Sequence, residues 1–208
     1  MDDAPDYRPV SPLAVAALVL GCCSAVALVT PFAWFVPLVG IVTAVAALAD
    51  LSRPAAPRVG RLPALAGLAL AVGFGAQAVA DAAVGRWIER SRAVATADAW
   101  IDAVRGGRLE EALGISSRAI LPSLGGPEPD SESDQAARFA ALEAVRAVAG
   151  GQTTLASAAP LGTSDRAWLV RATIADGAVV RIIAAPRTAA KGRAAVERWT
   201  VTAVEIES

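Results

Sequence analysis

The sequence contains no histidine, and several other reactive residue types are nearly absent. Lys191 and Tyr7 are the only residues of their kinds in 208 positions. Without histidine, the commonest general base, the Ser-His and Cys-His nucleophile pairs and the usual catalytic zinc ligands are missing. Carboxylate chemistry remains open. The composition nevertheless favours a protein that is not an enzyme and that holds no metal and no cofactor.

Cysteine is also scarce, since Cys22 and Cys23 are the only two and they are adjacent. Neighbouring cysteines rarely bridge each other, so no disulfide framework is expected. Both lie in an apolar run, where we expect them to behave as small apolar residues. The stretch 19–22 faintly resembles a lipoprotein cleavage box. The acidic tail before it and the apolar sequence after it favour a retained membrane span.

Charge is scarce in the first part of the chain. Residues 1–85 hold only four of the 19 basic residues and five of the 20 acidic ones. The remainder is close to neutral and has no basic stripe, which argues against nucleic acid as a partner.

A charge-free run from Pro12 to Ala49 dominates the first half. One helix needs about 20 apolar residues to cross a bilayer, and this run is nearly twice that length. Thr30, Pro31 and Pro37 interrupt it. The sequence therefore predicts two spans, at about 13–29 and 35–51, with Phe32, Trp34 and Phe35 at the turn as interfacial aromatics. A re-entrant hairpin is the alternative, because both spans are short.

A third span is expected at about 62–81, after an exposed loop at 52–61, and Asp81 then reaches the membrane interface. Residues 1–11 read as a disordered tail, so the membrane block covers 12–86. Small residues recur at helical spacing and favour close packing of the spans, with dimerisation as the alternative. They are Ala17, Gly21 and Ala25 in the first span and Gly67, Ala71 and Gly75 in the third.

The distribution of arginines predicts how the three spans are oriented in the membrane. Arg8, Arg53, Arg58 and Arg61 fall on one side of a three-span block, and Arg86, Arg90 and Arg92 on the other. The positive-inside rule then places the soluble domain outside the cytoplasm. The expected location is the cell membrane, with the lipid bilayer and a possible membrane or envelope protein as partners.

Three stretches carry a family resemblance: SPLAVAALVLG at 11–21, ALADLSR at 47–53 and GRLPALAGLALAVG at 60–73. Together they resemble a bacterial integral-membrane domain of unknown function. The resemblance implies a bacterial membrane location and no established chemistry. Cys22 and Pro63 depart from the usual pattern of that family.

The second half, 87–208, predicts an α+β domain. Helical spacing of apolar residues predicts helices at 87–105, 108–115 and 134–148, with a loop at 121–134. Alternating patterns then predict strands at 153–158, 166–174, 178–185 and 196–206, with a loop at 186–194. Ala175-Asp176-Gly177 is a hairpin signal between the second and third strands. We expect three helices packed on a four-stranded antiparallel sheet.

This order, with the stretch ADAWIDAVRGGRLEEAL at 97–113, resembles the cystatin-like cone fold of nuclear-transport-factor-like domains. The resemblance implies a pocket between sheet and helices. Four aromatic residues are candidates to line it, although aromatics at such positions are more often core. They are Trp100, Phe139, Trp168 and Trp199.

Charged residues offer weaker candidate sites. Asp98 and Asp102 lie one helical turn apart, but we expect them, like Glu110 and Glu111, to form a solvated face. Residues Arg187, Lys191 and Arg193 of the last hairpin loop could touch lipid head groups, with a solvated turn as the alternative.

The sequence thus favours a non-enzymatic, membrane-anchored module for binding, sensing or assembly. Two alternatives stay open. One is a small enzyme that uses a carboxylate in a cone-shaped pocket. The other is an accessory subunit of a membrane transport complex.

Overall fold

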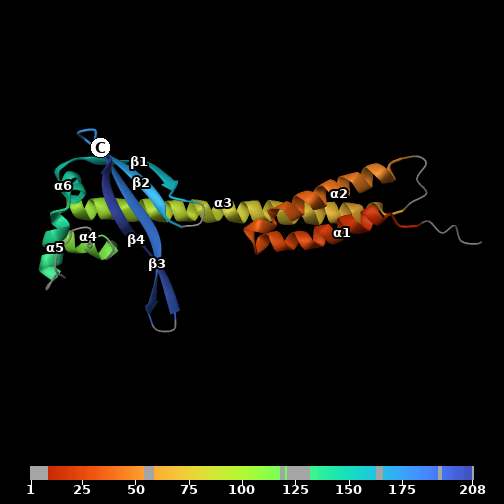
Figure 1. Ribbon diagram of the computed structural model, residues 1–208, viewed down its shortest axis with the longest axis horizontal. Coiled ribbons are helices and arrows are strands. Elements are labelled where there is room, and N and C mark those ends of the chain that lie inside the picture. Colours follow the sequence, from red (N-terminus) through yellow and green to blue (C-terminus); the bar gives the residue numbers. More distant parts are fainter. Residues whose placement is uncertain are drawn as a thin grey trace, which may run out of the picture. The chain divides into compact units, whose positions relative to one another are not determined.

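The computed structural model describes residues 9–53, 59–117, 120, 132–162, 166–191 and 194–207 (Figure 1). It divides into two compact units, Met1–Gly85 and Arg86–Ser208. The element α3 (Arg61–Arg105) contributes its first part to one unit and its last part to the other. The helices expected at 62–81 and 87–105 are thus one helix, because Gly85 costs a helix only about 1 kcal/mol and does not end it.

The first unit is entirely helical. It contains α1 (Pro12–Cys23), two 3₁₀ helices, η1 (Ser24–Leu28) and η2 (Pro31–Trp34), then α2 (Phe35–Leu51) and the start of α3. Pro12 and Pro31 each open a helix, where the missing N–H is not needed. The Ser24 hydroxyl donates to the carbonyl of Leu20 at 2.8 Å where α1 becomes η1. The two predicted apolar segments therefore appear as helical segments separated at Val29–Thr30.

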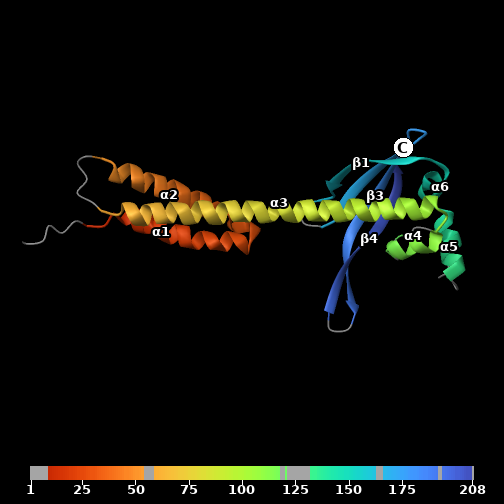
Figure 2. The ribbon, with the colours of Figure 1, turned by 180° about the vertical axis from the view of Figure 1, so that it is seen from behind.

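Within the described residues, two helices are long and apolar enough to cross a membrane, Phe32–Leu51 and Arg61–Arg105. A shorter apolar helix covers Pro12–Leu28. Figures 1 and 2 show α1 and α2 side by side along the first part of α3. The three segments form one bundle in this unit.

In this bundle the small side chains lie inside and the large apolar side chains lie outside, the reverse of the arrangement in a water-soluble protein. Every buried residue described between Pro9 and Gly85 is alanine, glycine, serine or proline. The large apolar side chains point outward instead, and Phe32 is 90% and Leu62 81% exposed. Among the large hydrophobic residues found exposed, all but Leu161 lie between Val10 and Ile88.

Glycine allows the helices to approach at their backbones. A Cβ atom added to Gly21 would lie 2.5 Å from the carbonyl oxygen of Gly67, and one added to Gly67 would collide with the carbonyl of Ala17. A Cβ atom added to Gly40 of α2 would lie 3.1 Å from that of Ala71. The small-residue faces expected to pack within the chain therefore do meet, although η1 buries Ser24 in place of Ala25.

The second unit is α+β, as predicted. Its helices are the end of α3, α4 (Leu109–Ile115), α5 (Glu132–Ala140) and α6 (Glu143–Gly150). Its strands are β1 (Thr153–Pro160), β2 (Trp168–Ile174), β3 (Val179–Lys191) and β4 (Ala194–Glu207). The four strands are antiparallel in the order β1-β2-β3-β4. Figure 2 shows the end of α3 running across this sheet.

The core lies between one face of the sheet and the helices. Along β2, Trp168, Val170, Ala172 and Ile174 are buried while the residues between them are not. This alternation is what a strand with one covered face produces. Gly177, with φ +89°, closes the predicted β2–β3 hairpin, and the carboxylate of Asp176 accepts a 3.0 Å hydrogen bond from the amide of Ala178.

Two predictions about this unit are wrong. The single helix at 134–148 is divided into α5 and α6, because Leu142 takes an extended conformation (ψ 132°) before α6. The loop at 186–194 is instead mostly strand, because β3 and β4 remain paired as far as Lys191 and Ala194. Pro186 is tolerated there since a two-stranded ribbon leaves alternate N–H groups outside the ladder. Of the expected loop at 121–134, residues 121–131 lie outside the described residues, and the last three belong to α5.

Candidate functional site

The four aromatic candidates from the sequence all lie in the core of the second unit. Trp100 and Phe139 are fully buried and meet edge to face, with ring centroids 6.2 Å apart and planes at 89°. Trp168 and Trp199 are almost as deeply buried. The structure therefore brings the four into one hydrophobic cluster. Of the four, Trp199 also lines a cavity.

Trp100 is fixed by a hydrogen bond that joins two elements. Its indole Nε1 donates to the Ser116 hydroxyl at 3.0 Å, and that hydroxyl donates to the Ala112 carbonyl at 2.8 Å. The next residue continues the link, since the Ser117 amide donates to the Val201 carbonyl at 2.7 Å. The segment that follows α4 is thereby held against β4.

The cavity opens on the surface between α3, α4 and β4 and has a volume of about 320 Å³. From α3 come Arg92, Ala95, Thr96 and Ala99, which share one helical face through their spacing of three and four residues. The alanines leave room that longer side chains would fill. The remaining lining residues are Ile115 of α4 and Arg198 and Trp199 of β4.

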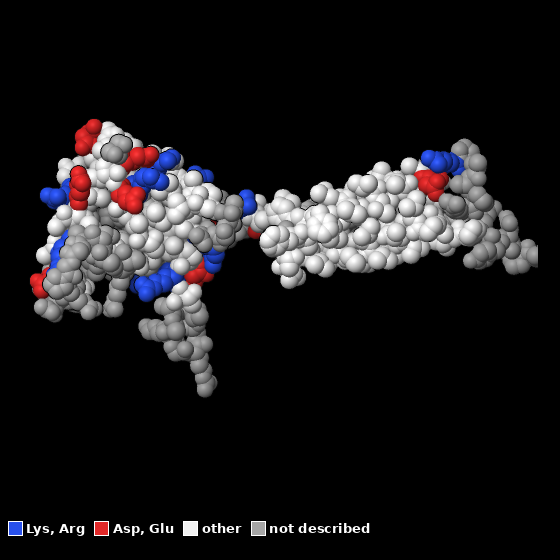
Figure 3. Space-filling view, in the orientation of Figure 1, with Lys and Arg blue, Asp and Glu red and all other residues white. Residues whose placement is uncertain are grey.

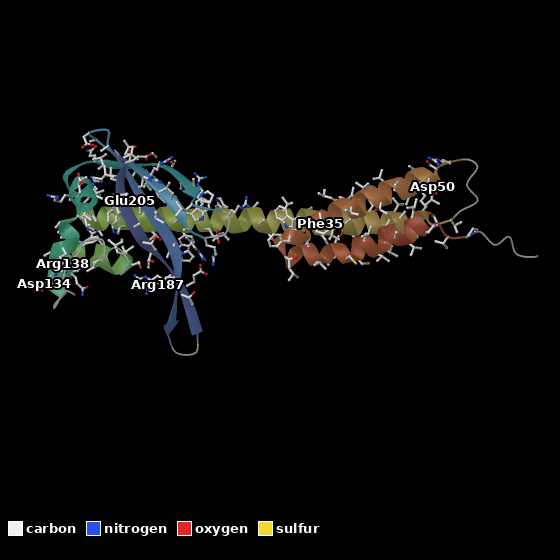
Figure 4. The ribbon with its side chains drawn as sticks, in the orientation of Figure 1. Phe35, Asp50, Asp134, Arg138, Arg187 and Glu205 are labelled. Carbon is white, nitrogen blue, oxygen red and sulfur yellow. The ribbon has the colours of Figure 1, made fainter. Side chains whose placement is uncertain are left out.

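The two arginines of this cavity have no acidic partner. Within the described part of the chain, no carboxylate lies within 4 Å of Arg92 or Arg198. Arg198 instead faces Arg187 across the β3–β4 ladder, and Arg187 is exposed where the hairpin extends from the sheet (Figure 4). Directly opposed like charges are destabilising in an antiparallel pair. The cavity therefore carries uncompensated positive charge.

A third arginine of this unit is bound in a different way. Arg166 donates to Glu89 at 2.6 Å and lies 2.9 Å from a carboxylate oxygen of Glu197. The hydrogen bond to Glu89, followed by that to Glu197, raises the pKa of Arg166. This bridge ties α3 to β4. It also occupies Glu197, the carboxylate next to Arg198 in sequence.

The acidic candidates do not line the cavity. Asp98, Asp102, Glu110 and Glu111 are exposed, and Glu111 pairs with Arg108 at 2.7 Å. They form the solvated face that was expected. The described residues include no group of three or more His, Cys, Asp or Glu side chains that could hold a metal ion. The side chains of Lys191 and Arg193 lie outside the described residues.

A second hollow lies in the first unit, between η1, η2, α2 and α3. It measures about 590 Å³, and its lining is apolar, including Trp34, Leu38, Ile41, Val72 and Val79. Charges on this unit are few: Asp50 and Arg53 lie 3.7 Å apart at the end of α2, opposite to the end that begins with Phe35 (Figure 4). Figure 3 shows charged side chains gathered on the second unit, with the visible surface between the ends of the bundle uncharged.

Comparison with protein-family models, with curated proteins and with solved structures finds no match to this chain. The two resemblances drawn from the sequence therefore remain predictions.

Proposed function

We propose that this chain is a multi-pass membrane protein whose second unit serves as a non-enzymatic binding or assembly module outside the cytoplasm. The observation that carries the proposal is the inverted packing of the first unit. Alanine, glycine and serine fill its interior, while valine, leucine and phenylalanine cover its surface. Water disfavours a continuous apolar surface of this kind, and lipid accepts it.

The low burial of these apolar helices distinguishes a membrane bundle from the helical core of a soluble protein. In the most apolar windows of Phe32–Leu51 and Arg61–Arg105, only 22% of the residues are buried. A core helix of a soluble protein is mostly buried. A cleaved signal sequence is also disfavoured, because α1 packs closely against α3 through Gly21 and Gly67.

Length supports three spans. Residues 32–51 and 62–80 extend about 30 Å and about 28 Å as helices, close to the hydrocarbon thickness. The first segment is shorter in residues. However, η1 rises about 2 Å per residue, so α1 and η1 together reach about 28 Å. All three segments are then of similar length.

A backbone hydrogen bond supports placing the tail at 1–11 and the loop at 52–61 on the same side of the membrane. The Ser11 amide donates to the Val59 carbonyl at 2.9 Å, so the start of α1 and the start of α3 lie together. Arg53 and Arg61 belong to that end and Arg86, Arg90 and Arg92 to the sequence after the third span. With Arg8 and Arg58 included, the positive-inside rule favours an external second unit.

The test is a topology assay on the full chain. One reporter that is active only outside the cytoplasm, and one active only inside, are fused in turn after Ser208. We expect the external reporter alone to be active and the protein to remain in membranes after an alkaline carbonate wash. An active internal reporter would contradict the orientation. Release of the protein into the soluble fraction would contradict the membrane location itself.

A second candidate is an accessory subunit of a membrane complex, and the apolar hollow of the first unit favours it. A helix of another protein could fill this space between α2 and α3. Co-purification with one membrane protein, lost when Gly75 at the hollow is replaced by leucine, would support this role.

A further inference from the structure

We infer that the cavity of Arg92 and Arg198 binds the head group of an acidic phospholipid. The inference rests on the proposed membrane location, which supplies the ligand at high local concentration. Three features of the cavity carry it: its unpaired positive charge, its apolar wall and its small size.

The first feature is the positive charge of the cavity. Arg92 and Arg198 are exposed, line the same cavity, and have no carboxylate within 4 Å in the described part of the chain. Arg187 adds a further positive charge opposite Arg198. Arginine pairs well with phosphate, because the planar guanidinium can form two parallel hydrogen bonds to its oxygens. A bound phosphate would also relieve the repulsion across the β3–β4 ladder.

The apolar wall of the cavity indicates which kind of group lies next to the phosphate in the ligand. Apart from the arginines and Thr96, the lining consists of Ala95, Ala99, Ile115 and Trp199. The Thr96 hydroxyl already donates to the Arg92 carbonyl at 2.8 Å, so the two guanidiniums are the main donors. A free phosphate would not pack against the apolar wall. A ligand with an anionic group and an adjoining apolar part can pair with the arginines and also pack against that wall.

The small size of the cavity disfavours a peptide. Peptides are usually recognised along a sheet edge or an extended groove. This cavity is about 320 Å³, near the lower limit of small-molecule sites, and suits a head group with the glycerol and first acyl carbons. An acidic phospholipid is the anionic amphiphile that a membrane protein meets most often.

The experiment measures lipid binding to the full chain purified in a non-ionic detergent. The probes are dihexanoyl phosphatidylglycerol, dihexanoyl phosphatidylcholine with the same acyl chains, and inorganic phosphate. Isothermal titration calorimetry gives the Kd of each. We expect saturable binding of phosphatidylglycerol at one site, with phosphatidylcholine and phosphate each at least about tenfold weaker.

The test variant replaces Arg92→Gln and Arg198→Gln together. The control replaces Arg105→Gln and Arg146→Gln, two exposed arginines that remove the same charge but lie outside the cavity. We expect the test variant to weaken phosphatidylglycerol binding about tenfold or more and the control to leave it within about twofold. Circular dichroism establishes that both variants are folded.

Three outcomes overturn the inference: equal binding of the two lipids, phosphate binding as tight as that of phosphatidylglycerol, and an equal loss in both variants. The measurement is made in detergent, so it does not depend on the topology assay. A chain that stays in membranes yet shows no preference for phosphatidylglycerol refutes the inference alone. A chain found in the soluble fraction refutes the proposed function.

Discussion

Gly21 of α1 and Gly67 of α3 meet backbone to backbone, so that a single methyl group on either one would overlap the other helix. A Cβ atom on Gly21 would lie 2.5 Å from the Gly67 carbonyl oxygen and 2.8 Å from its Cα. Glycine is needed here for space rather than for a special φ angle, since both residues are helical. Close approach of this kind maximises van der Waals contact between helices in lipid, where burial in itself gives little driving force.

Substitution of Gly21→Ala or Gly67→Ala should therefore destabilise the bundle by about 1–3 kcal/mol, as overpacking does in other cores. Gly73→Ala is the matched control in the same helix, because a Cβ atom there meets nothing within 4 Å. Alanine at 73 should be neutral or slightly stabilising, through its higher helix propensity. Thermal unfolding of each variant in detergent gives the comparison. An equal loss at positions 67 and 73 would show that the two helices do not touch as described.

The two cysteines provide a test of what surrounds the bundle. Cys22 and Cys23 are exposed, and they occupy the middle of the segment Pro12–Leu28. Thiols exposed to water react with a charged, water-soluble maleimide, whereas such a charged reagent does not enter the apolar interior of a bilayer. In intact membranes we expect no labelling by that reagent and full labelling after denaturation in detergent.

The control for this labelling is Ser52→Cys combined with Cys22→Ala and Cys23→Ala. Ser52 is exposed just beyond α2, so its replacement should react with the charged reagent when membranes are opened on both sides. Rapid labelling of native Cys22 and Cys23 in the same membranes would indicate that the bundle surface faces water.

Much of this fold could be predicted from local patterns. The charge-free run and its prolines located α1, α2 and the turn between them, and the Ala175-Asp176-Gly177 signal located the β2–β3 hairpin. The break at Leu142 could not be found, because the apolar period continues from Phe139 to Val145 across it. The extension of β3 and β4 was missed since small and charged residues between Pro186 and Val196 show no alternation.

The cavity could not be predicted either. Its arginines are 106 positions apart in the sequence, on α3 and on β4, and no local pattern relates them. In the sequence, Arg92 bears only on the predicted orientation of the spans, and no pattern singles out Arg198. Trp199 is a candidate through its aromatic character alone, and its place at the cavity depends on the register of β3 with β4.

Arg166 should contribute modestly to stability and independently of pH across the neutral range. Its exposed bridge to Glu89 and Glu197 predicts a loss of about 0.2–1 kcal/mol for Arg166→Gln, smaller at high salt. The hydrogen bonds raise the folded-state pKa of Arg166, so its contribution is complete below the ordinary arginine pKa. It is lost only as the pH rises through the raised value. Urea unfolding at about pH 6 and about pH 9 should therefore give the same difference between variant and wild type. A difference that disappears at the higher pH would contradict this assignment.

The two core tryptophans should respond differently to the same substitution. Trp100 donates its Nε1 hydrogen to Ser116 at 3.0 Å, whereas the buried Nε1 of Trp199 has no partner within the described residues. Trp100→Phe and Trp199→Phe remove similar volumes, so the loss of packing is comparable. Trp100→Phe also removes a hydrogen bond, while Trp199→Phe removes an unsatisfied donor. We expect Trp100→Phe to cost about 1 kcal/mol more. Urea unfolding of the full chain in detergent, followed by far-ultraviolet circular dichroism, measures both.

Adding Ser116→Ala should cost less in the Trp100→Phe variant than in wild type, because the partner of the hydroxyl is already gone. Additive losses at positions 100 and 116 would show that the bond contributes nothing.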